Sequence, residues 1–126
     1  MGASEALGEW REKDSMPFNY YQESTSKTAI YPKKTEMEAI TYCTLGLASE
    51  AAEICGKLKK VMRDDNSVLT EDRKKAIVDE IGDVLWYVSE LCTNLGVTME
   101  TVAQRNLSKL QKRKDSGTLK GDGDNR

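Results

Sequence analysis

The sequence predicts an all-α protein: a four-helix bundle-like domain built on a long antiparallel helix hairpin. Apolar residues recur in steps of three and four along most of the chain, which is the spacing of one helix face. The two prolines, Pro17 and Pro32, both precede the long periodic segments and leave the rest free to form helix. Strand-like alternation of useful length does not occur in the sequence.

The first predicted element is a short helix that begins near residues 16–17. It ends at residues 31–32, because the residue before a proline avoids the α region. The residues expected to face the core are Phe18, Tyr21, Ala29 and Ile30. Residues 1–15 are polar, aperiodic and contain glycine, so we expect a flexible N-terminal arm there.

The second predicted helix begins behind Thr35, which forms a capping box with Glu38 three residues later. It ends near Arg63, where the polar residues 64–67 indicate a turn. Its apolar seam consists of Ile40, Cys43, Leu47, Ala51, Ile54, Leu58 and Val61.

The third predicted helix begins behind Thr70 and ends near Gly96, a typical C-terminal cap. Its seam consists of Ile77, Ile81, Val84, Val88, Leu91 and Leu95. Thr98 caps a fourth helix, which ends before Gly117 and carries Val102, Ala103, Leu107 and Leu110. The domain is therefore expected over residues 16–116, followed by a polar, glycine-rich tail over residues 117–126.

The composition narrows the range of functions. The chain has 126 residues, the size of one domain, and its net charge of -2 draws it to neither nucleic acid nor an anionic membrane. No apolar run approaches the length of a membrane span and no signal-peptide core occurs, so we expect a cytoplasmic protein. The three cysteines are expected to be buried free thiols. The absence of histidine excludes a Ser-His-Asp triad and a histidine-ligated di-iron site within this chain.

Two acidic pairs, Glu50/Glu53 and Glu80/Asp83, are each spaced i,i+3 and lie symmetrically about the predicted turn. In a helix hairpin all four carboxylates meet at one level, roughly 20 Å from the turn at ~1.5 Å rise per residue. Each pair precedes seam residues by one position and so lies on the shoulder of an apolar stripe. Because the chain contains no histidine, this group of carboxylates predicts a site for a hard cation that prefers oxygen ligands. The expected ion is Mg²⁺, with Mn²⁺ as a possible substitute.

Two plainer interpretations compete with a metal site. The acids could form a solvated face, since like charges at this spacing cost only about 0.2–0.5 kcal/mol per pair. They could also be neutralised by salt bridges to Lys57 and Lys60. Two pairs at matched height argue against the first alternative, because like charges that meet in a groove raise each other's pKa and destabilise the fold.

Basic and polar side chains further along the groove would meet the distal phosphates of a metal-bound substrate. Lys57 and Lys60 occupy such positions on the second helix. Asn106, Lys109 and Arg113 form a polar row on the fourth. For each cation, a solubilising surface charge is the alternative interpretation.

Three segments together carry a resemblance to a known family. They are TLGLASEAAE (residues 44–53), DEIGDVLWY (79–87) and NLSKL (106–110), and the closing residues 117–126 are similar to those of short, phage-type members. The chain resembles a MazG-like protein of the all-α nucleoside triphosphate pyrophosphatase superfamily, over about residues 18–126. The resemblance implies Mg²⁺-dependent hydrolysis of a nucleoside triphosphate, often a deoxynucleotide, to the monophosphate and pyrophosphate.

The same resemblance implies roles for individual residues. Glu50, Glu53, Glu80 and Asp83 correspond to the metal ligands, and Tyr87, Asn106 and Lys109 match positions that line the nucleotide pocket. Members are homodimers or dimer-based tetramers, which agrees with the small core expected of one chain. Trp86 is interpreted as a core or interface residue.

One departure from the family pattern concerns Ser49, which stands where members often carry a further acid. It leaves open the number of metal ions and the base that activates water, for which we choose Glu50. It also supports a rival function, a non-catalytic helical interaction module on a degenerate pyrophosphatase scaffold. A second rival, a single-stranded nucleic-acid binder, is disfavoured by the acidic balance and the few aromatic residues.

Overall fold

The computed structural model describes residues 15–121, and this range contains helices and no strand. Four α-helices follow in order, α2 (Phe18–Thr25), α3 (Glu36–Asp64), α4 (Glu71–Asn94) and α5 (Met99–Asp115), with a 3₁₀ turn η1 (Ser26–Thr28) after α2. The all-α class predicted from the sequence is confirmed. The predicted N-terminal arm, apart from Ser15, and the tail beyond residue 121 lie outside the described residues.

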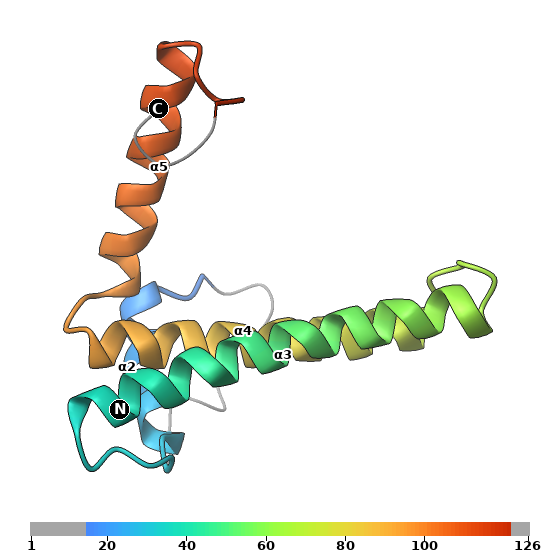
Figure 1. Cartoon of the computed structure of the whole chain (residues 1–126), viewed down its shortest axis with the longest axis horizontal. Coiled ribbons are helices and arrows are strands. Elements are labelled where there is room, and N and C mark those ends of the chain that lie inside the picture. Colours follow the sequence, from blue (N-terminus) through green and yellow to red (C-terminus); the bar gives the residue numbers. More distant parts are fainter. Residues whose placement is uncertain (1–14, 122–126) are drawn as a thin grey trace.

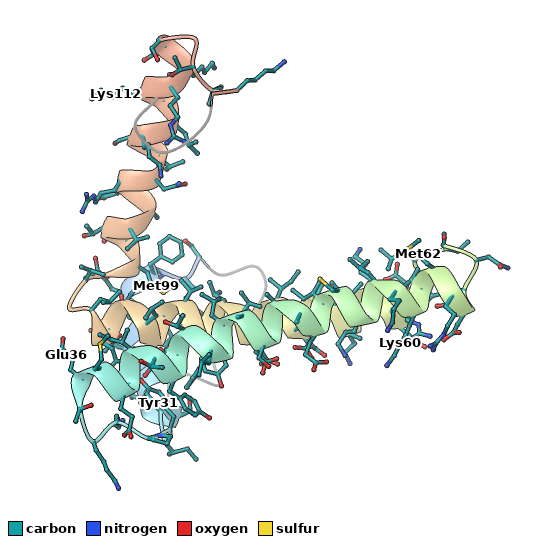
Figure 2. All side chains as sticks on the ribbon, in the orientation of Figure 1. Tyr31, Glu36, Lys60, Met62, Met99 and Lys112 are labelled. Carbon is teal, nitrogen blue, oxygen red and sulfur yellow. The ribbon has the colours of Figure 1, made fainter. Side chains whose placement is uncertain are left out.

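The long helices α3 and α4 lie side by side and are joined at one end by a short loop (Figure 1). Near the opposite end of this pair, α2 packs against α4. Helix α5 begins at that same end and extends away from the pair. Figure 2 shows Lys60 and Met62 close to the connecting loop, whereas Tyr31 and Met99 lie at the other end of the molecule.

The helix starts follow from local capping. The side-chain oxygens of Thr35, Thr70 and Thr98 accept hydrogen bonds from backbone N–H groups of the first turns of α3, α4 and α5. These bonds are 3.0, 3.2 and 3.1 Å long, and each cap was predicted from the sequence. Gly96 has φ of 72° after the end of α4, the left-handed conformation that a glycine cap provides.

The first helix is shorter than predicted. It ends at Thr25 and gives way to the 3₁₀ turn, and at this point the hydroxyls of Thr25 and Ser26 donate hydrogen bonds to Glu90 of α4. After the turn the chain is not helical, so successive side chains point in opposite directions. Ala29 and Tyr31 are therefore buried, and Ile30 between them is 94% exposed. The prediction that Ile30 faces the core is wrong, as is that for Phe18, which is 47% exposed.

The core lies where α2, α3 and α4 meet. It consists of Ala29, Tyr31, Ala39 and Cys43, with Trp86, Tyr87 and Leu91 packed against it. Cys43 and Cys92 are buried, but Cys55 is exposed, so the prediction of three buried thiols is wrong at Cys55. Towards the connecting loop the α3–α4 pair has little cover from the other residues within 15–121, and seam residues there are exposed, such as Leu58 at 47% and Ile81 at 51%.

Within the described residues, no helix combines the length and the apolar character needed to cross a membrane.

Candidate metal centre

Three carboxylates meet between the two long helices. Glu50 comes from α3, and Glu80 and Asp83 come from α4, one helical turn apart. One oxygen of each side chain lies within 4.8 Å of an oxygen of the other two. Glu50 and Glu80 are half-buried, and Asp83 is exposed, so the group borders solvent.

A glycine beside this group allows the helices to approach closely. The ring of Tyr87 on α4 lies directly against Gly46 of α3, in the space that a Cβ atom at that position would fill. Gly46 stands four residues before Glu50, and Tyr87 stands four residues after Asp83. Each of the two contacting residues is therefore about one helical turn from an acid of its own helix. The Gly46–Tyr87 contact sets the distance between the helices at the level of the carboxylates.

The electrostatics of the group are those of crowded like charges. The pKa of Glu50 is raised, most of all by a hydrogen bond with Glu80, then by desolvation and by the negative charges of its neighbours. A hydrogen bond between two carboxyl groups needs a proton on one of them. When both are ionised, Glu80 Oε2 is a buried oxygen without a donor among the described residues.

The donor set fits a hard divalent cation. Lys57 Nζ lies 3.6 Å from Glu80 Oε1 and supplies one positive charge beside three carboxylates. The group therefore keeps an excess of negative charge and a buried oxygen that needs a partner. Carboxylate oxygens are the ligands that Mg²⁺ and Mn²⁺ prefer.

The fourth predicted ligand, Glu53, is not part of this group of three. Its side chain is exposed on α3, one turn beyond Glu50. Its negative charge is nevertheless among the causes that raise the pKa of Glu50. The structure thus places Glu53 near the centre without bringing its oxygens to the other three carboxylates.

The predicted substrate-binding residues of the hairpin differ in their positions. Lys57 pairs with Glu80 in the centre. Lys60 is exposed and lies toward the connecting loop (Figure 2). Tyr87 borders the centre: its pKa is raised by burial and then by the charges of Tyr42 and Glu50. Its ring also contacts Trp86, with the centroids 5.1 Å apart.

The remaining predicted residues lie on α5, which points away from the α3–α4 pair (Figure 1). Asn106 and Lys109 line a shallow hollow of about 420 Å³ together with Val102 and Arg105. Arg113 is buried near the end of the same helix, at 5% exposure. Within one chain, therefore, α5 does not carry this row to the carboxylates.

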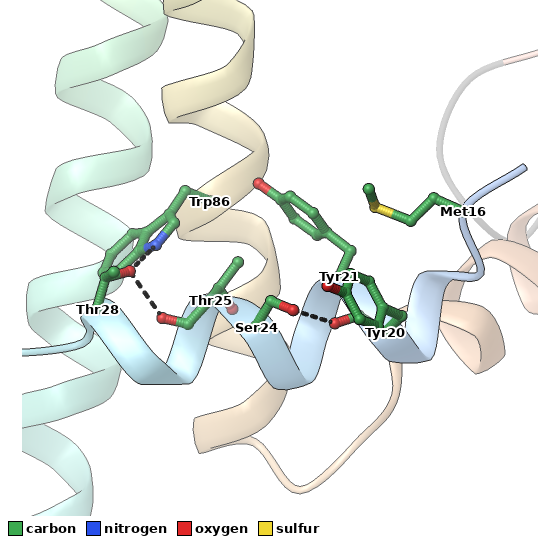
Figure 3. Close-up of a pocket in the computed structure, with 7 residues that line it drawn as sticks. All are labelled: Met16, Tyr20, Tyr21, Ser24, Thr25, Thr28 and Trp86. Atoms are coloured by element: carbon green, nitrogen blue, oxygen red, sulfur yellow. Dashed lines mark hydrogen bonds between the residues drawn. The ribbon is translucent and has the colours of Figure 1, made fainter. Parts of the chain in front are cut away.

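The sequence analysis missed a cavity of about 220 Å³ between α2 and α4 (Figure 3). Its lining consists of Met16, Tyr20, Tyr21, Ser24, Thr25, Thr28 and Trp86. Trp86, expected to be a core or interface residue, packs against the core and also forms one wall of this cavity. The signal available in the sequence was the pair of aromatic residues in the first helix, Tyr20 and Tyr21.

A long helix hairpin with an acidic centre, one glutamate from the first arm and an E-x-x-D pair from the second, places the chain among all-α proteins with a candidate cation site between two helices. Comparison with protein families gives the particular family: residues 39–118 match the MazG nucleotide pyrophosphohydrolase domain, and the chain belongs to this family. It is also 46% identical over 114 residues to the Gene 37 protein of Mycobacterium phage L5, covering 88% of this chain and 100% of that protein. No solved structure gave a significant match.

Proposed function

We propose that the chain hydrolyses nucleoside triphosphates, deoxynucleotides among them, to the nucleoside monophosphate and pyrophosphate in a Mg²⁺-dependent reaction. One observation carries the proposal: ligand oxygens of Glu50, Glu80 and Asp83 lie within 4.8 Å of one another between α3 and α4. Family membership supports the reaction class, nucleotide pyrophosphohydrolysis. Mn²⁺ is expected to replace Mg²⁺, because both take carboxylate oxygens.

In this proposal the three clustered acids hold the cation, and Glu53 is the fourth ligand. A bound divalent ion polarises a phosphoryl oxygen and lowers the pKa of water. Repulsion among several ionised carboxylates in one site destabilises the metal-free protein. A bound cation would offset this repulsion and so favour the ionised form of all the carboxylates.

Glu50 is the proposed base. It accepts a proton from the water whose oxygen attacks the α-phosphorus, and the bond from that phosphorus to the bridging oxygen breaks. Pyrophosphate leaves with this oxygen.

Lys57 and Lys60 are proposed to stabilise the negative charge on the leaving pyrophosphate. Lys57 already stands at the centre, where its ammonium group pairs with Glu80. Once a cation neutralises Glu80, Lys57 is available to a phosphate oxygen. Tyr87, on the same row of α4 as the acids, is proposed to contact the nucleotide.

We also propose that the protein works as a homodimer or a dimer-based tetramer. Large apolar side chains are exposed on α3, α4 and α5, for example Leu58 at 47%, Ile81 at 51% and Leu107 at 68%. The row of Asn106, Lys109 and Arg113 lies on a helix that points away from its own acids. Arg113 is buried in its own chain, but Asn106 and Lys109 line an open hollow. A second copy would cover the apolar surface and supply these two residues to the site.

The proposal is tested by measuring pyrophosphate released from a panel of ribo- and deoxyribonucleoside triphosphates, with and without Mg²⁺. Asp83→Asn and Glu53→Gln should each lower kcat/KM by about 100-fold or more, which is the usual effect of losing one metal ligand or one oriented charge. The matched control is Asp79→Asn, which removes an exposed acid of α4 outside the acidic group. Unchanged hydrolysis in Asp83→Asn would reject the assigned roles.

Ser49 favours one second candidate, a partner-binding module without catalysis. It stands beside Glu50 in place of an acid that the family often carries. This alternative predicts no pyrophosphate release from any triphosphate, whether or not Mg²⁺ is present.

A further inference from the structure

A second acidic residue of α4 is buried away from the metal centre. Glu90 is 2% exposed and lies seven residues beyond Asp83, two turns along the helix. Its Oε2 accepts hydrogen bonds from the hydroxyls of Thr25 at 2.8 Å and Ser26 at 3.2 Å. Its Oε1 accepts one from the hydroxyl of Tyr31 at 2.9 Å. All three donors belong to residues 25–31, where α2 ends and the chain turns towards α3.

Two other side chains of α4 form hydrogen bonds with Thr25 and Tyr31, which also donate to Glu90. The hydroxyls of Ser89 and Thr25 lie 2.7 Å apart, and Asn94 Nδ2 donates to the Tyr31 hydroxyl at 2.7 Å. A buried carboxylate with several directed partners is costly compared with apolar packing, but it allows only one arrangement of the groups around it. This network therefore fixes the position of residues 25–31 on α4.

The segment held in this way forms one wall of the cavity between α2 and α4. Thr25 and Thr28 line the cavity, and Trp86 of α4 faces them (Figure 3). The indole Nε1 of Trp86 donates to Thr28 Oγ1 at 2.9 Å. Any shift of residues 25–28 would change the width of the cavity and the environment of Trp86.

The cavity also adjoins the metal centre. Trp86 stands one turn after Asp83 on α4. The pKa of Tyr21, on the opposite wall, is raised by burial and then by the negative charge of Asp83. At about 220 Å³ the cavity is smaller than the ~300 Å³ of a typical site for a drug-sized ligand. It can hold one ring system rather than a whole nucleotide, and its aromatic walls suit a flat heterocycle.

We propose that Glu90 is a positioning residue: by fixing residues 25–31 on α4, it shapes the α2–α4 cavity to receive the base of a nucleotide whose phosphates lie at the acids. Glu90 itself does not contact the substrate. This inference rests on the proposed function for the identity of the ligand, but its test needs neither Mg²⁺ nor hydrolysis.

The test follows the fluorescence of Trp86. A Trp10→Phe background leaves Trp86 as the single tryptophan of the chain. Adenosine and thymidine, titrated without Mg²⁺, should quench it. Glu90→Gln keeps the size of the side chain but replaces one acceptor oxygen by an amide group that donates. We expect its dissociation constant for the nucleosides to rise by about tenfold, the value of one to two hydrogen bonds.

Two readouts separate positioning from general damage. Helical content by circular dichroism and Mn²⁺ binding at the acids, followed by electron paramagnetic resonance, should be the same in Glu90→Gln as in the parent. Should Glu90→Gln fail to fold, Ser26→Ala removes one of the three donors and should show the same split, with a smaller loss. Its control is Thr41→Val, which removes a hydroxyl bonded to Met37 of its own helix.

Three results would overturn the inference: no quenching of Trp86 by either nucleoside in the parent, equal nucleoside binding in Glu90→Gln or its substitute, or equal losses of nucleoside and Mn²⁺ binding. The proposed function fails separately, by absence of pyrophosphate release. A protein that binds nucleosides through Trp86 without hydrolysing triphosphates would support the cavity and reject the enzyme.

Discussion

At the scale of single residues, the glycine at position 46 matters because it decides how closely two helices approach. An added Cβ there would meet the Tyr87 ring. We expect Gly46→Ala to destabilise the protein by about 1–3 kcal/mol, the usual cost of overpacking, and to weaken Mg²⁺ binding one turn away. Chemical denaturation with and without Mg²⁺ measures both effects.

Gly82→Ala is the matched control for that prediction. Gly82 lies in α4 between two metal-centre residues, and nothing comes within 4 Å of a Cβ added there. An alanine should stabilise the helix by about 0.5–1 kcal/mol, because glycine loses more backbone entropy on folding. If Gly46→Ala behaved like Gly82→Ala, the close contact with Tyr87 would not set the site.

A second residue-scale prediction concerns pH. The pKa of Glu50 is raised in the folded chain, so the folded state holds this proton more tightly than the unfolded state does. Above the pKa of the unfolded chain, ionisation of this carboxyl group therefore favours unfolding. The contribution of this carboxyl group to the stability of the metal-free protein is lost as pH rises from below its ordinary pKa of 4.5 through the raised folded pKa. Glu50→Gln should therefore raise the melting temperature of the metal-free protein at pH 7 and leave it nearly unchanged at pH 4.

Mg²⁺ should reverse that order at pH 7. At a concentration of 100 times its dissociation constant, a ligand stabilises the folded state by about 2.7 kcal/mol. The parent should gain this stability and Glu50→Gln should gain much less, in differential scanning fluorimetry with and without EDTA. If Mg²⁺ did not change the melting temperature of the parent protein at neutral pH, the proposed metal site would be rejected.

At the scale of helices, the sequence predicts what depends on neighbours in the chain. The caps at Thr35, Thr70 and Thr98 need only residues three positions away, and all three form. The first helix was predicted too long, and where it ends Thr25 bonds to Glu90, which is 65 residues away in the sequence. No local pattern reports a bond over that separation.

The acidic site shows the same limit. Its i,i+3 pairs and their symmetry about the turn are visible in the sequence. They predict that four carboxylates meet, and oxygens of three of them, Glu50, Glu80 and Asp83, lie within 4.8 Å of one another. Glu53 shares the spacing, but whether its side chain turns inward depends on packing that spacing does not encode. The position of α5 could not be predicted either, since it depends on side-chain contacts to α2.

Gln22 of α2 makes those contacts. Its Nε2 donates to Thr93 Oγ1 at 3.1 Å and to the Val97 carbonyl at 3.0 Å, and its Oε1 accepts from the Met99 N–H at 2.8 Å. Gln22→Ala should destabilise the α4–α5 junction by about 1–3 kcal/mol, because it removes three hydrogen bonds, two exposed and one partly buried. Hydrogen exchange at the Met99 amide should become faster.

Gln111→Ala is the control for this change, because Gln111 bonds to Asp115 within α5 itself. It should leave exchange at the junction unchanged. Protection of the Met99 amide in Gln22→Ala equal to the parent would mean that α5 is held in place by other contacts.

At the scale of the whole molecule, the exposed apolar seam of the hairpin bears on self-association. Ile81→Ser removes half-exposed apolar surface, and Ile30→Ser removes an almost fully exposed side chain from the segment after η1. If copies pack through the hairpin, Ile81→Ser should raise the dissociation constant of the oligomer by about tenfold or more. Ile30→Ser should not, and sedimentation equilibrium distinguishes the two. A parent that stays monomeric at micromolar concentration would exclude an obligate oligomer.

Self-association also bears on the composition of the site. Asp83 lies in the acidic centre, and Lys109 lies on α5, which points away from that centre in its own chain. If α5 of one copy completes the site of another, Asp83→Asn and Lys109→Ala should each be inactive alone. After the two are mixed and allowed to exchange subunits, about a quarter of the parent activity should return, because half of the dimers are mixed and each has one intact site. If each chain used its own Lys109, the mixture would hydrolyse no more triphosphate than its components, since neither chain holds both residues.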